Sequence, residues 1–303
     1  MPDAPLGVLP MRALVQAVST TLAAAERLEP EVRADALREA QLLVAGVLDV
    51  APGDVLRRSA LGDQLTADEV QAVQRAAARR GQGEPLAYCV GRAAFRDLVL
   101  AVDARVLIPR PETEIVVEEA LRVTAGTPGG VAVDIGTGSG AIALALATEG
   151  RFTRVIATDV SQDALAVAQA NAEAVAPATP VEFRAGADLA PVATLKPGGA
   201  GARVIVSNPP YIAYTEAPAL PASVRAWEPP VALFADRDGM ARYEALLAGA
   251  PAVLEPGGWL VLELDATRAV RTADLARAQG YDEVRLVRDL AGRDRVLVAR
   301  WTS

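Results

Sequence analysis

The chain has 303 residues, of which 51% are hydrophobic and 22% charged, and its formal net charge is −8. This length favours two domains, and the longest apolar runs fall well short of the ~20 residues that a membrane span requires, so we expect no membrane association. The absence of histidine and the presence of one cysteine exclude Ser-His-Asp and Cys-His catalysis, zinc sites built on Cys and His, and an internal disulfide.

Composition also bears on compartment and partners. The lone Cys89 and a start without the features of a signal peptide fit a reducing compartment, so we expect a cytoplasmic protein, and we expect no metal site. Because tight binding to duplex nucleic acid usually needs a basic face, the acidic balance argues against direct nucleic-acid binding. The chemistry must then depend on carboxylates, amides, backbone groups or a cofactor.

Residues 1–85 are predicted to form a small helical domain. Apolar residues recur at helical spacing from Met11 to Leu22 and again from Leu37 to Leu48. A later helix is predicted to begin after Thr66, which forms the pattern of a capping box with Glu69. From the residues alone, a purely structural bundle explains this region as well as a functional one does.

Residues 86–108 are predicted to form a hairpin-like connector. Apolar residues alternate with their neighbours near Leu100, and Arg105–Ile108 is rich in β-forming residues. Pro109-Arg110-Pro111-Glu112-Thr113-Glu114 follows and is predicted to open a helix, since a proline at the start and acids in the first turn fit helix polarity. Taken alone, this segment would also suit a domain linker.

From residue 131 the chain alternates strands and helices, which predicts a doubly wound α/β sheet. The predicted strands are 131–135, 155–158, 181–183, 204–207, 259–264, 283–287 and 295–299. The predicted helices are 141–147, 164–174, 243–250 and 270–278.

A glycine-rich loop, Gly136-Thr137-Gly138-Ser139-Gly140, joins the first strand to its helix. Glycines let backbone amides approach a ligand closely, and a helix N-terminus favours an acidic group. Asp159 ends the second strand, where its carboxylate can accept both hydroxyls of a ribose. Because Gly136, Gly138 and Ala141 also satisfy the dinucleotide pattern, the loop alone fits a nicotinamide cofactor and S-adenosylmethionine equally well.

Two neighbouring segments favour the adenosyl cofactor. Asp134 lies two residues before the first glycine and can face the methionine end of that cofactor. Asp188 and Leu189 follow the third strand and can supply an acceptor for the adenine amino group and an apolar lid. All these segments follow the carboxyl ends of strands, where ligands gather in open sheets.

Asn208-Pro209-Pro210-Tyr211 follows the fourth strand. Proline has no N–H to donate, so the proline carbonyls remain free acceptors beside the Asn208 side-chain oxygen. Such acceptors suit a planar NH2 group, and Tyr211 adds an aromatic wall. The combination resembles the motif by which one class of methyltransferases holds an amide or an exocyclic amine for N-methylation, and it decides between the two cofactors. A proline-rich turn is the structural alternative.

With these motifs in place, the chain resembles the protein-(glutamine-N5) methyltransferases that modify class I peptide chain release factors. The matching segments are Glu84-Pro85, Tyr88, Gly91, Phe95, residues 107–114, residues 227–233, Asp238-Gly239, Asp289, Ala291-Gly292 and Arg295. The chain departs from the family at Leu100, where an aromatic is frequent, and after Glu263, where Gly and later Gln are common and Leu264-Asp265-Ala266-Thr267-Arg268 stands.

The resemblance implies a class I Rossmann-like S-adenosylmethionine-dependent methyltransferase domain over residues 109–303 and a substrate-recognition role for residues 1–85. It also implies that the methyl group passes to N5 of the glutamine in the Gly-Gly-Gln motif of a release factor. The expected cofactor-binding residues are Asp134, Gly136, Thr137, Gly138, Ser139, Gly140, Asp159, Asp188, Leu189 and Asn208. Asn208, Pro209, Pro210 and Tyr211 are expected to bind the substrate, and Asn208, Pro209 and Tyr211 to carry the catalysis.

Three other functions fit the sequence less well. The first is a nucleic-acid N-methyltransferase acting on adenine or cytosine amines, since Asn-Pro-Pro-Tyr also occurs in DNA adenine methyltransferases. Such a base-flipping enzyme needs basic and aromatic groups, and the acidic balance and the 4% of aromatic residues argue against it. A binding protein that keeps the fold without activity does not explain the intact loop, aspartates and Asn208. A nicotinamide oxidoreductase offers no account of Asn-Pro-Pro-Tyr.

Overall fold

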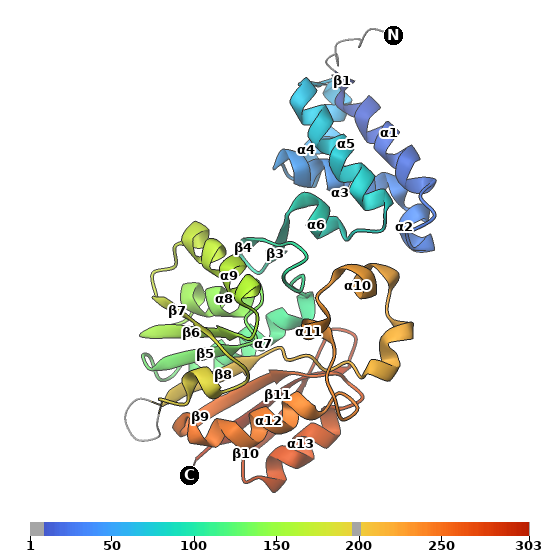
Figure 1. Ribbon diagram of the computed structural model, residues 1–303. Coiled ribbons are helices and arrows are strands. Elements are labelled where there is room, and N and C mark those ends of the chain that lie inside the picture. The colour runs from blue at the N-terminus through green and yellow to red at the C-terminus, as the bar shows by residue number, and fades with distance from the viewer. Residues whose placement is uncertain (1–8, 196–200, 303) are drawn as a thin grey trace. The chain divides into compact units, whose positions relative to one another are not determined.

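The computed structural model describes residues 9–195 and 201–302, which divide into two compact units (Figure 1). The first unit contains the described residues up to Arg92 together with Leu220–Trp227. The second contains Ala93–Ala219 and the described residues from Glu228 onwards. Within the described residues, no helix combines the length and the apolar character that a membrane crossing would need.

The first unit is a helical bundle with one apolar core. Its elements are β1 (Leu9–Pro10), α1 (Met11–Ala23), α2 (Pro30–Ala34), α3 (Ala36–Leu48), α4 (Pro52–Leu61), β2 (Gln64–Leu65), α5 (Ala67–Gly81), α6 (Leu86–Val90) and α10 (Ala222–Trp227). The predicted capping box is confirmed, because the Glu69 amide donates to Thr66 Oγ1 and the Thr66 amide donates to Glu69 Oε2 at 2.7 Å. The apolar faces of α1, α3 and α5 supply most of the core.

The segment Leu220–Trp227 is held to this bundle by a side chain. Glu29 Oε1 accepts hydrogen bonds from the Ser223 amide at 3.3 Å and from Ser223 Oγ at 2.7 Å. The sequence gives no local sign of this contact, which joins residues far apart in the chain. Residues 220–227 therefore belong structurally to a unit other than that of the segments on either side of them.

The second unit is built on a seven-stranded sheet of order β10-β11-β9-β8-β5-β6-β7. The strands are β5 (Val131–Ile135), β6 (Arg154–Asp159), β7 (Val181–Ala185), β8 (Ala202–Ser207), β9 (Leu254–Glu263), β10 (Asp282–Arg288) and β11 (Asp294–Trp301). Neighbours from β7 to β9 pair in parallel, whereas β11 pairs antiparallel with both β9 and β10. This is the predicted α/β, class I Rossmann-like methyltransferase fold.

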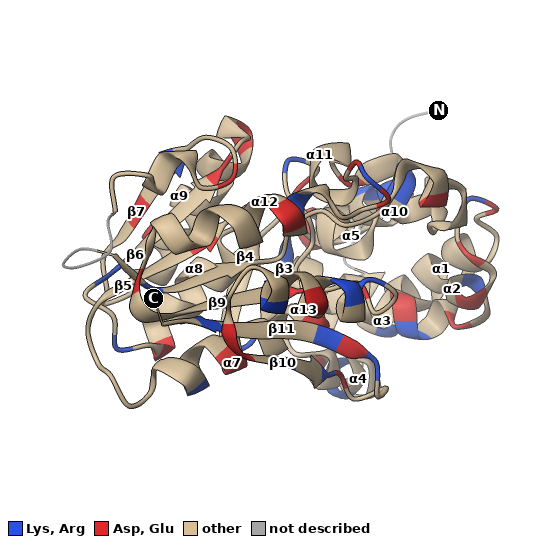
Figure 2. Ribbon diagram, turned by 90° about the horizontal axis from the view of Figure 1, so that it is seen from below, with Lys and Arg blue, Asp and Glu red and all other residues tan. Residues whose placement is uncertain are grey.

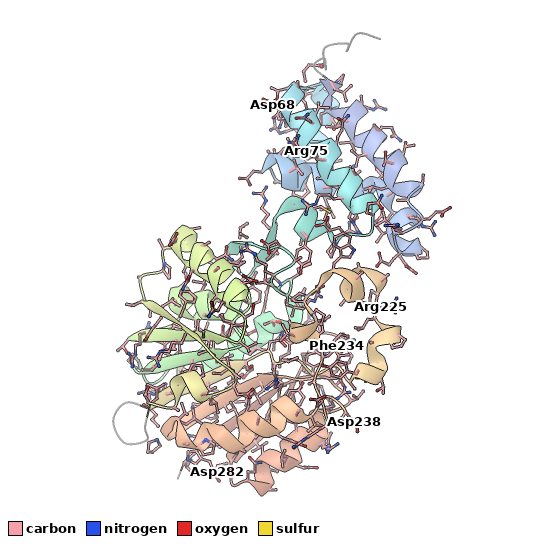
Figure 3. All side chains as sticks on the ribbon, viewed as in Figure 1. Asp68, Arg75, Arg225, Phe234, Asp238 and Asp282 are labelled. Atoms are coloured by element: carbon pink, nitrogen blue, oxygen red, sulfur yellow. The ribbon has the colours of Figure 1, made fainter. Side chains whose placement is uncertain are left out.

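Alternating side chains along the strands divide the core of this unit between the two faces of the sheet. Val133 and Ile205 pack in the cluster with α12 (Ala241–Gly249) and α13 (Ala269–Ala278). Ala132 and Val204, one residue earlier on each strand, pack with α7 (Pro111–Thr124) and α8 (Ala141–Glu149). On the same face as α8 lies α9 (Gln162–Val175), whose Ala172 and Val175 pack against that cluster, and side chains fill the space between sheet and helices (Figure 3).

The strand order reverses at β5, whose neighbours are β6 on one side and β8 on the other. In open α/β sheets a ligand crevice forms at such a switch point, beyond the carboxyl ends of the strands. The glycine-rich loop follows β5, and Asn208 follows β8. The fold therefore brings these two motifs to one place.

The connector contains a true hairpin of β3 (Arg92–Phe95) and β4 (Leu98–Ala101). Residues Arg105–Ile108, whose composition suggested more β structure, form no strand, and Val106 closes a turn onto Asp103. Between β8 and α12, the structure adds η2 (Tyr214–Ala219) and α11 (Pro230–Leu233), which the periodicity did not predict. Short helices that contain or begin with proline carry too little periodic signal to be recognised.

Candidate active site

One pocket lies at the carboxyl ends of β5, β6 and β8, within the second unit. Of the predicted site residues, Gly136, Gly138, Asp159, Asp188, Asn208, Pro209 and Pro210 line it. Asp134, Thr137, Ser139, Gly140, Leu189 and Tyr211 do not line it. The predicted residues therefore separate into a group that faces the pocket and a group that lies behind it.

The backbone of the glycine-rich loop borders the pocket directly, because its glycines have no side chain. Gly136 and Gly138 have positive φ values of 75° and 55°, and a Cβ on either would meet no protein atom within 4 Å. Their amides are already used, since the Gly136 amide donates to the Thr158 carbonyl and the Gly138 amide donates to Asp159 Oδ2, both at 2.9 Å. The sequence predicts that these amides contact a ligand directly. This geometry does not fit that role, because both N–H groups already donate to acceptors at the end of β6.

Two other loop residues serve the packing behind the pocket. A Cβ on Gly140 would lie 3.3 Å from Ala168 Cβ, so this glycine permits close approach of α8 to α9. Ser139 is almost fully buried, and its carbonyl accepts a hydrogen bond from Asn171 Nδ2 at 2.8 Å. Both positions fix the shape of the loop.

Asp159 presents an oriented carboxylate to the pocket. Its Oδ2 accepts from the Gly138 amide, and its Oδ1 accepts from the Ser161 amide at 2.9 Å. An ionised carboxylate offers about four acceptor sites, so each oxygen keeps capacity for a ligand hydroxyl.

Asp134 is fully buried behind the loop. Its Oδ2 accepts from Thr137 Oγ1 at 2.6 Å and from the Ala143 amide at 3.2 Å. Its Oδ1 has no hydrogen-bond partner among the described residues. Burial raises the pKa of Asp134 to about 7, and the charge of Asp159 adds to the rise. A cationic ligand group would both pair the vacant oxygen and favour the ionised form.

Asp188 lines the pocket beside a residue that the sequence did not indicate. Both of its oxygens accept from Arg242 Nη1, at 3.1 and 3.0 Å, and Arg242 also lines the pocket. Leu189 turns away into the core, where its Cδ1 packs close to Gly249. The expected apolar lid therefore lies beneath the pocket lining.

Asn208 is held at the pocket by hydrogen bonds on its far side. Its Nδ2 donates to Thr113 Oγ1 at 3.1 Å, and Thr113 Oγ1 donates to Glu263 Oε2 at 2.6 Å. Ser207 Oγ donates to the Ile135 carbonyl at 2.7 Å and ties the end of β8 to β5. The sequence indicates Thr113 only as part of the Pro-Arg-Pro-Glu-Thr-Glu signature. It indicates Glu263 only as the residue after which the chain departs from the family pattern.

Pro209 and Pro210 line the pocket, whereas Tyr211 packs against the core of β9, α12 and α13. Burial raises the pKa of Tyr211, and the nearby carboxyl of Glu263 adds to the rise, so the phenol stays neutral. The role of Tyr211 as an aromatic wall stays a prediction.

Two further segments with family-like sequence complete the lining. Arg105, Val106 and Leu107 precede the Pro-Arg-Pro-Glu-Thr-Glu signature, and Pro229, Val231 and Ala232 belong to the stretch after Trp227. An ion pair joins the two stretches, since Arg110 Nη2 donates to Glu228 Oε1. Burial raises the pKa of Glu228, although Arg110 opposes that rise.

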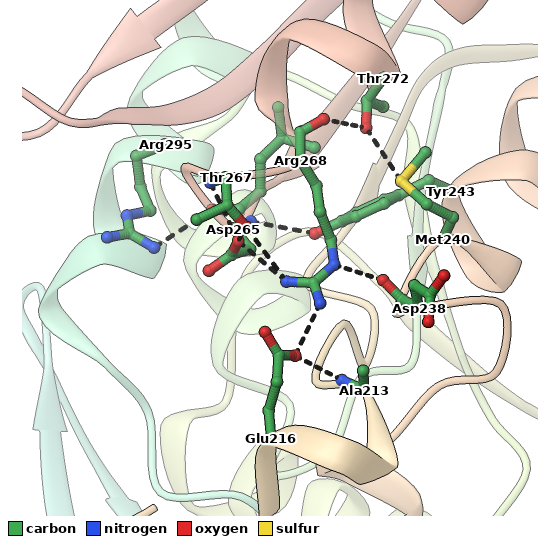
Figure 4. Close-up of polar contacts among 11 residues, drawn as sticks. Ala213, Glu216, Asp238, Met240, Tyr243, Asp265, Thr267, Arg268, Thr272 and Arg295 are labelled. Carbon is green, nitrogen blue, oxygen red and sulfur yellow. Dashed lines mark hydrogen bonds and ion pairs between the residues drawn. The ribbon is translucent and has the colours of Figure 1, made fainter. Parts of the chain in front are cut away.

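The departures from the family pattern lie outside the pocket lining. Asp265 and Arg268 form an ion pair of 2.9 Å, and Arg268 also donates to Glu216 Oε2 and to the Asp238 carbonyl, both at 2.6 Å (Figure 4). Leu100 is fully buried in the core beside α7 and α8. Asp265 and Arg268, the two charged residues among these departures, therefore pair with each other.

Comparison with known proteins gives matches over most of the chain. Residues 20–91 match the PrmC N-terminal domain, and residues 113–220 match the methyltransferase small domain. The release factor glutamine methyltransferase of Cereibacter sphaeroides is 37% identical over 94% of this chain and 99% of its own length. That of Moorella thermoacetica is 40% identical over 86% of this chain and 90% of its own.

Among solved structures, the hMettl16 catalytic domain in complex with the MAT2A 3′UTR hairpin 6 has a TM-score of 0.50. It is 15% identical and covers 77% of this chain and 81% of its own. At that identity the likeness concerns the fold alone.

Proposed function

The chain belongs to the family of release factor glutamine methyltransferases, and from that membership we propose the methyl donor, the acceptor atom and the roles of the pocket residues. The enzyme methylates a glutamine side chain of a peptide chain release factor. The proposed donor is S-adenosylmethionine, and the proposed acceptor is N5 of the glutamine in the Gly-Gly-Gln motif of class I release factors. Termination of translation places this substrate in the cytoplasm.

The residues at the switch point fit this donor. Asp159 would accept the ribose hydroxyls and Asp188 the adenine amino group, and the buried carboxyl of Asp134 would favour the ammonium of the methionine end from behind the loop. The open space above Gly136 and Gly138 leaves room for a ligand against the backbone. When bound, S-adenosylmethionine supplies a methyl group carried on a positively charged sulfur.

The observation that carries the proposal is the orientation of Asn208. Its NH2 group donates to Thr113 Oγ1, so its Oδ1 remains as an acceptor, and Pro209 lines the same pocket. The Asn208 oxygen and the Pro209 carbonyl would accept the two N–H groups of the substrate glutamine and fix the direction of its nitrogen lone pair. Orientation of bound reactants contributes roughly 7–11 kcal/mol. After transfer, the positively charged nitrogen loses a proton to water, so no histidine base is needed.

The same pair of acceptors explains selectivity for an amide. A glutamate carboxylate would place acceptors against acceptors and leave buried polar groups unpaired. A mismatch of this kind discriminates by about 10⁴–10⁵. Residues 1–85, within the first unit, are proposed to grip the body of the release factor.

Charged side chains do not favour a nucleic-acid substrate. In the view of Figure 2, basic residues are interspersed with acidic ones over the described parts of both units. A duplex-binding enzyme would require a continuous basic face.

One assay tests the proposal. Labelled S-adenosylmethionine is incubated with the enzyme and a purified release factor, its Gly-Gly-Gln variant with Gln replaced by Ala, or duplex DNA. Label is expected on the unaltered factor alone. Equal labelling of the Ala variant, or labelling of DNA, would contradict it.

A further inference from the structure

Asn208 stands at the end of a buried chain of hydrogen bonds. Its Nδ2 lies 3.1 Å from Thr113 Oγ1, which lies 2.6 Å from Glu263 Oε2. Thr113 is 4% exposed and Glu263 1% exposed, so water does not compete for these contacts. The three residues come from the end of β8, the first turn of α7 and the end of β9.

The chemistry of the last member fixes the direction of every bond in this chain. An ionised carboxylate can only accept, so the single hydroxyl proton of Thr113 must point to Glu263. The Thr113 oxygen is then left as an acceptor. Only the NH2 end of the Asn208 amide can face it, and the amide oxygen must face the opposite way.

We infer that Thr113 and Glu263 are positioning residues that keep the Asn208 oxygen directed at the substrate amide, an inference that rests on the proposed role of Asn208. Without them, the Asn208 amide can rotate by half a turn. Its NH2 would then oppose the NH2 of glutamine and would suit a carboxylate. The two residues thereby set both the rate and the choice of glutamine over glutamate.

This chain of hydrogen bonds from Asn208 through Thr113 to Glu263, here called the relay, keeps its direction only when Glu263 is ionised. Burial raises the pKa of Glu263 to about 7, the Thr113 hydrogen bond and the charges of Arg295 and Arg110 lower it, and Glu112 raises it. The phenols of Tyr211 and Tyr243 also lie near this carboxyl and stay neutral through burial. A protonated Glu263 can donate to Thr113, which frees the Thr113 proton for the Asn208 oxygen and removes the directional constraint.

The first test compares valine and serine at position 113. Thr113→Val keeps the shape and removes the hydroxyl, and we expect kcat for methylation of a Gly-Gly-Gln peptide to fall about 10- to 100-fold, as for loss of a supporting hydrogen bond. Thr113→Ser keeps the hydroxyl and should restore most of the rate. Thr124→Val is the matched control, because Thr124 is a buried threonine at the other end of α7 whose hydroxyl, among the described residues, bonds only to carbonyls of its own helix.

A second readout separates positioning from general structural damage. The affinities of Gly-Gly-Gln and Gly-Gly-Glu peptides are measured with S-adenosylhomocysteine present. In Thr113→Val the preference for glutamine should fall at least about tenfold, with glutamine binding weakened and glutamate binding strengthened. Thr124→Val should keep the wild-type ratio.

The third readout is the pH profile of Glu263→Gln, whose side chain does not titrate. The wild-type rate should rise through about pH 7, and the variant should lose this acid limb. If Thr113→Val does not fold, the pH profile of Glu263→Gln and the rate of Thr113→Ser test whether Thr113 and Glu263 orient the Asn208 amide. Wild-type rate and peptide ratio in Thr113→Val, or an unchanged acid limb in Glu263→Gln, overturn the relay. A wild-type enzyme that labels no release factor overturns the proposed function instead, and the relay with it.

Discussion

At the scale of single residues, the site depends on polar side chains that are oriented by hydrogen bonds to the surrounding protein. Asn208 and Asp134 each have one polar side-chain atom bonded to the protein, and Asp159 has both oxygens bonded to backbone amides. Asn208 and Asp159 line the pocket and keep acceptor capacity for ligands, whereas Asp134 lies behind it with an unpaired buried oxygen. Substitutions at these positions should therefore separate substrate handling from cofactor handling.

Asn208→Ala removes the acceptor proposed to grip the substrate amide. We expect kcat to fall by on the order of 10²–10³, as for loss of one preorganised polar contact, while the Kd for S-adenosylmethionine changes far less. Single-turnover methylation and calorimetric titration measure the two quantities. Wild-type turnover in a folded variant would refute the role of Asn208.

Asp159→Ala should weaken cofactor binding, because the ribose hydroxyls lose a charged acceptor worth about 1.5–3 kcal/mol. Asp163→Ala is the matched control, since Asp163 is an exposed acid nearby on α9 and does not line the pocket. Calorimetry should give a raised Kd for the first variant and an unchanged one for the second. Equal Kd values would remove Asp159 from the cofactor site.

Two buried acids predict how stability depends on pH. Burial raises the pKa values of Asp134 and Glu263 to about 7, above their ordinary values of 3.8 and 4.5. The folded state therefore binds more protons than the unfolded chain in this range, so stability from these groups is present at low pH and is lost as pH rises through about 7. Urea unfolding between about pH 5 and about pH 8 should show a smaller fall for Glu263→Gln than for the wild type. An identical slope would contradict the assignment.

At the scale of elements, Arg268 joins three segments of the second unit, of which two lie between β8 and α12 and one follows β9 (Figure 4). It binds Glu216 in η2, Asp265 after β9 and the Asp238 carbonyl before α12. Glu216 also accepts from the Ala213 amide at 2.7 Å. The cluster thus fixes the chain just beyond Tyr211.

Arg268→Gln should loosen this junction. The expected loss in unfolding free energy is about 1–3 kcal/mol, because hydrogen bonds to charged groups are broken, and amide exchange should quicken over residues 211–219. Arg271→Gln is the control, since Arg271 is 65% exposed and lies 3.9 Å from its partner Glu244. The control should change stability by less than about 0.5 kcal/mol. Equal effects would show that the cluster contributes nothing specific.

Periodicity and motifs predicted the sheet, its main helices and the meeting of the glycine loop with Asn208. They predicted these features because each depends on local pattern and on the rule for strand ends. They did not predict Arg242 beside Asp188 or Glu263 behind Asn208, since such pairs depend on which side chains the fold brings together across 54 and more residues. The tight turn that consumes the Gly136 and Gly138 amides was missed for the same reason: its partners lie on another strand.

At the scale of the whole molecule, the first unit is proposed to recognise the body of the release factor. A chain that begins at Ala93 retains the pocket and its lining residues. We expect its kcat/KM on the whole factor to fall at least about tenfold, which corresponds to about 1.4 kcal/mol of lost binding, and to fall much less on a short Gly-Gly-Gln peptide. Equal losses on both substrates would argue against recognition by the first unit.

Residues 220–227 belong to the first unit, whose other helices end by Arg92, but they add no residue to its apolar core. A nascent chain leaves the ribosome from its N-terminus at about 5–20 residues per second, so this segment emerges on the order of ten seconds after the rest of the first unit. During that interval Glu29 lacks its hydrogen-bond partner Ser223, and the strands β5, β6 and β8 have already been synthesised. The contact between Glu29 and Ser223 therefore forms only after the residues of the bundle core and the strands β5 to β8 have been synthesised.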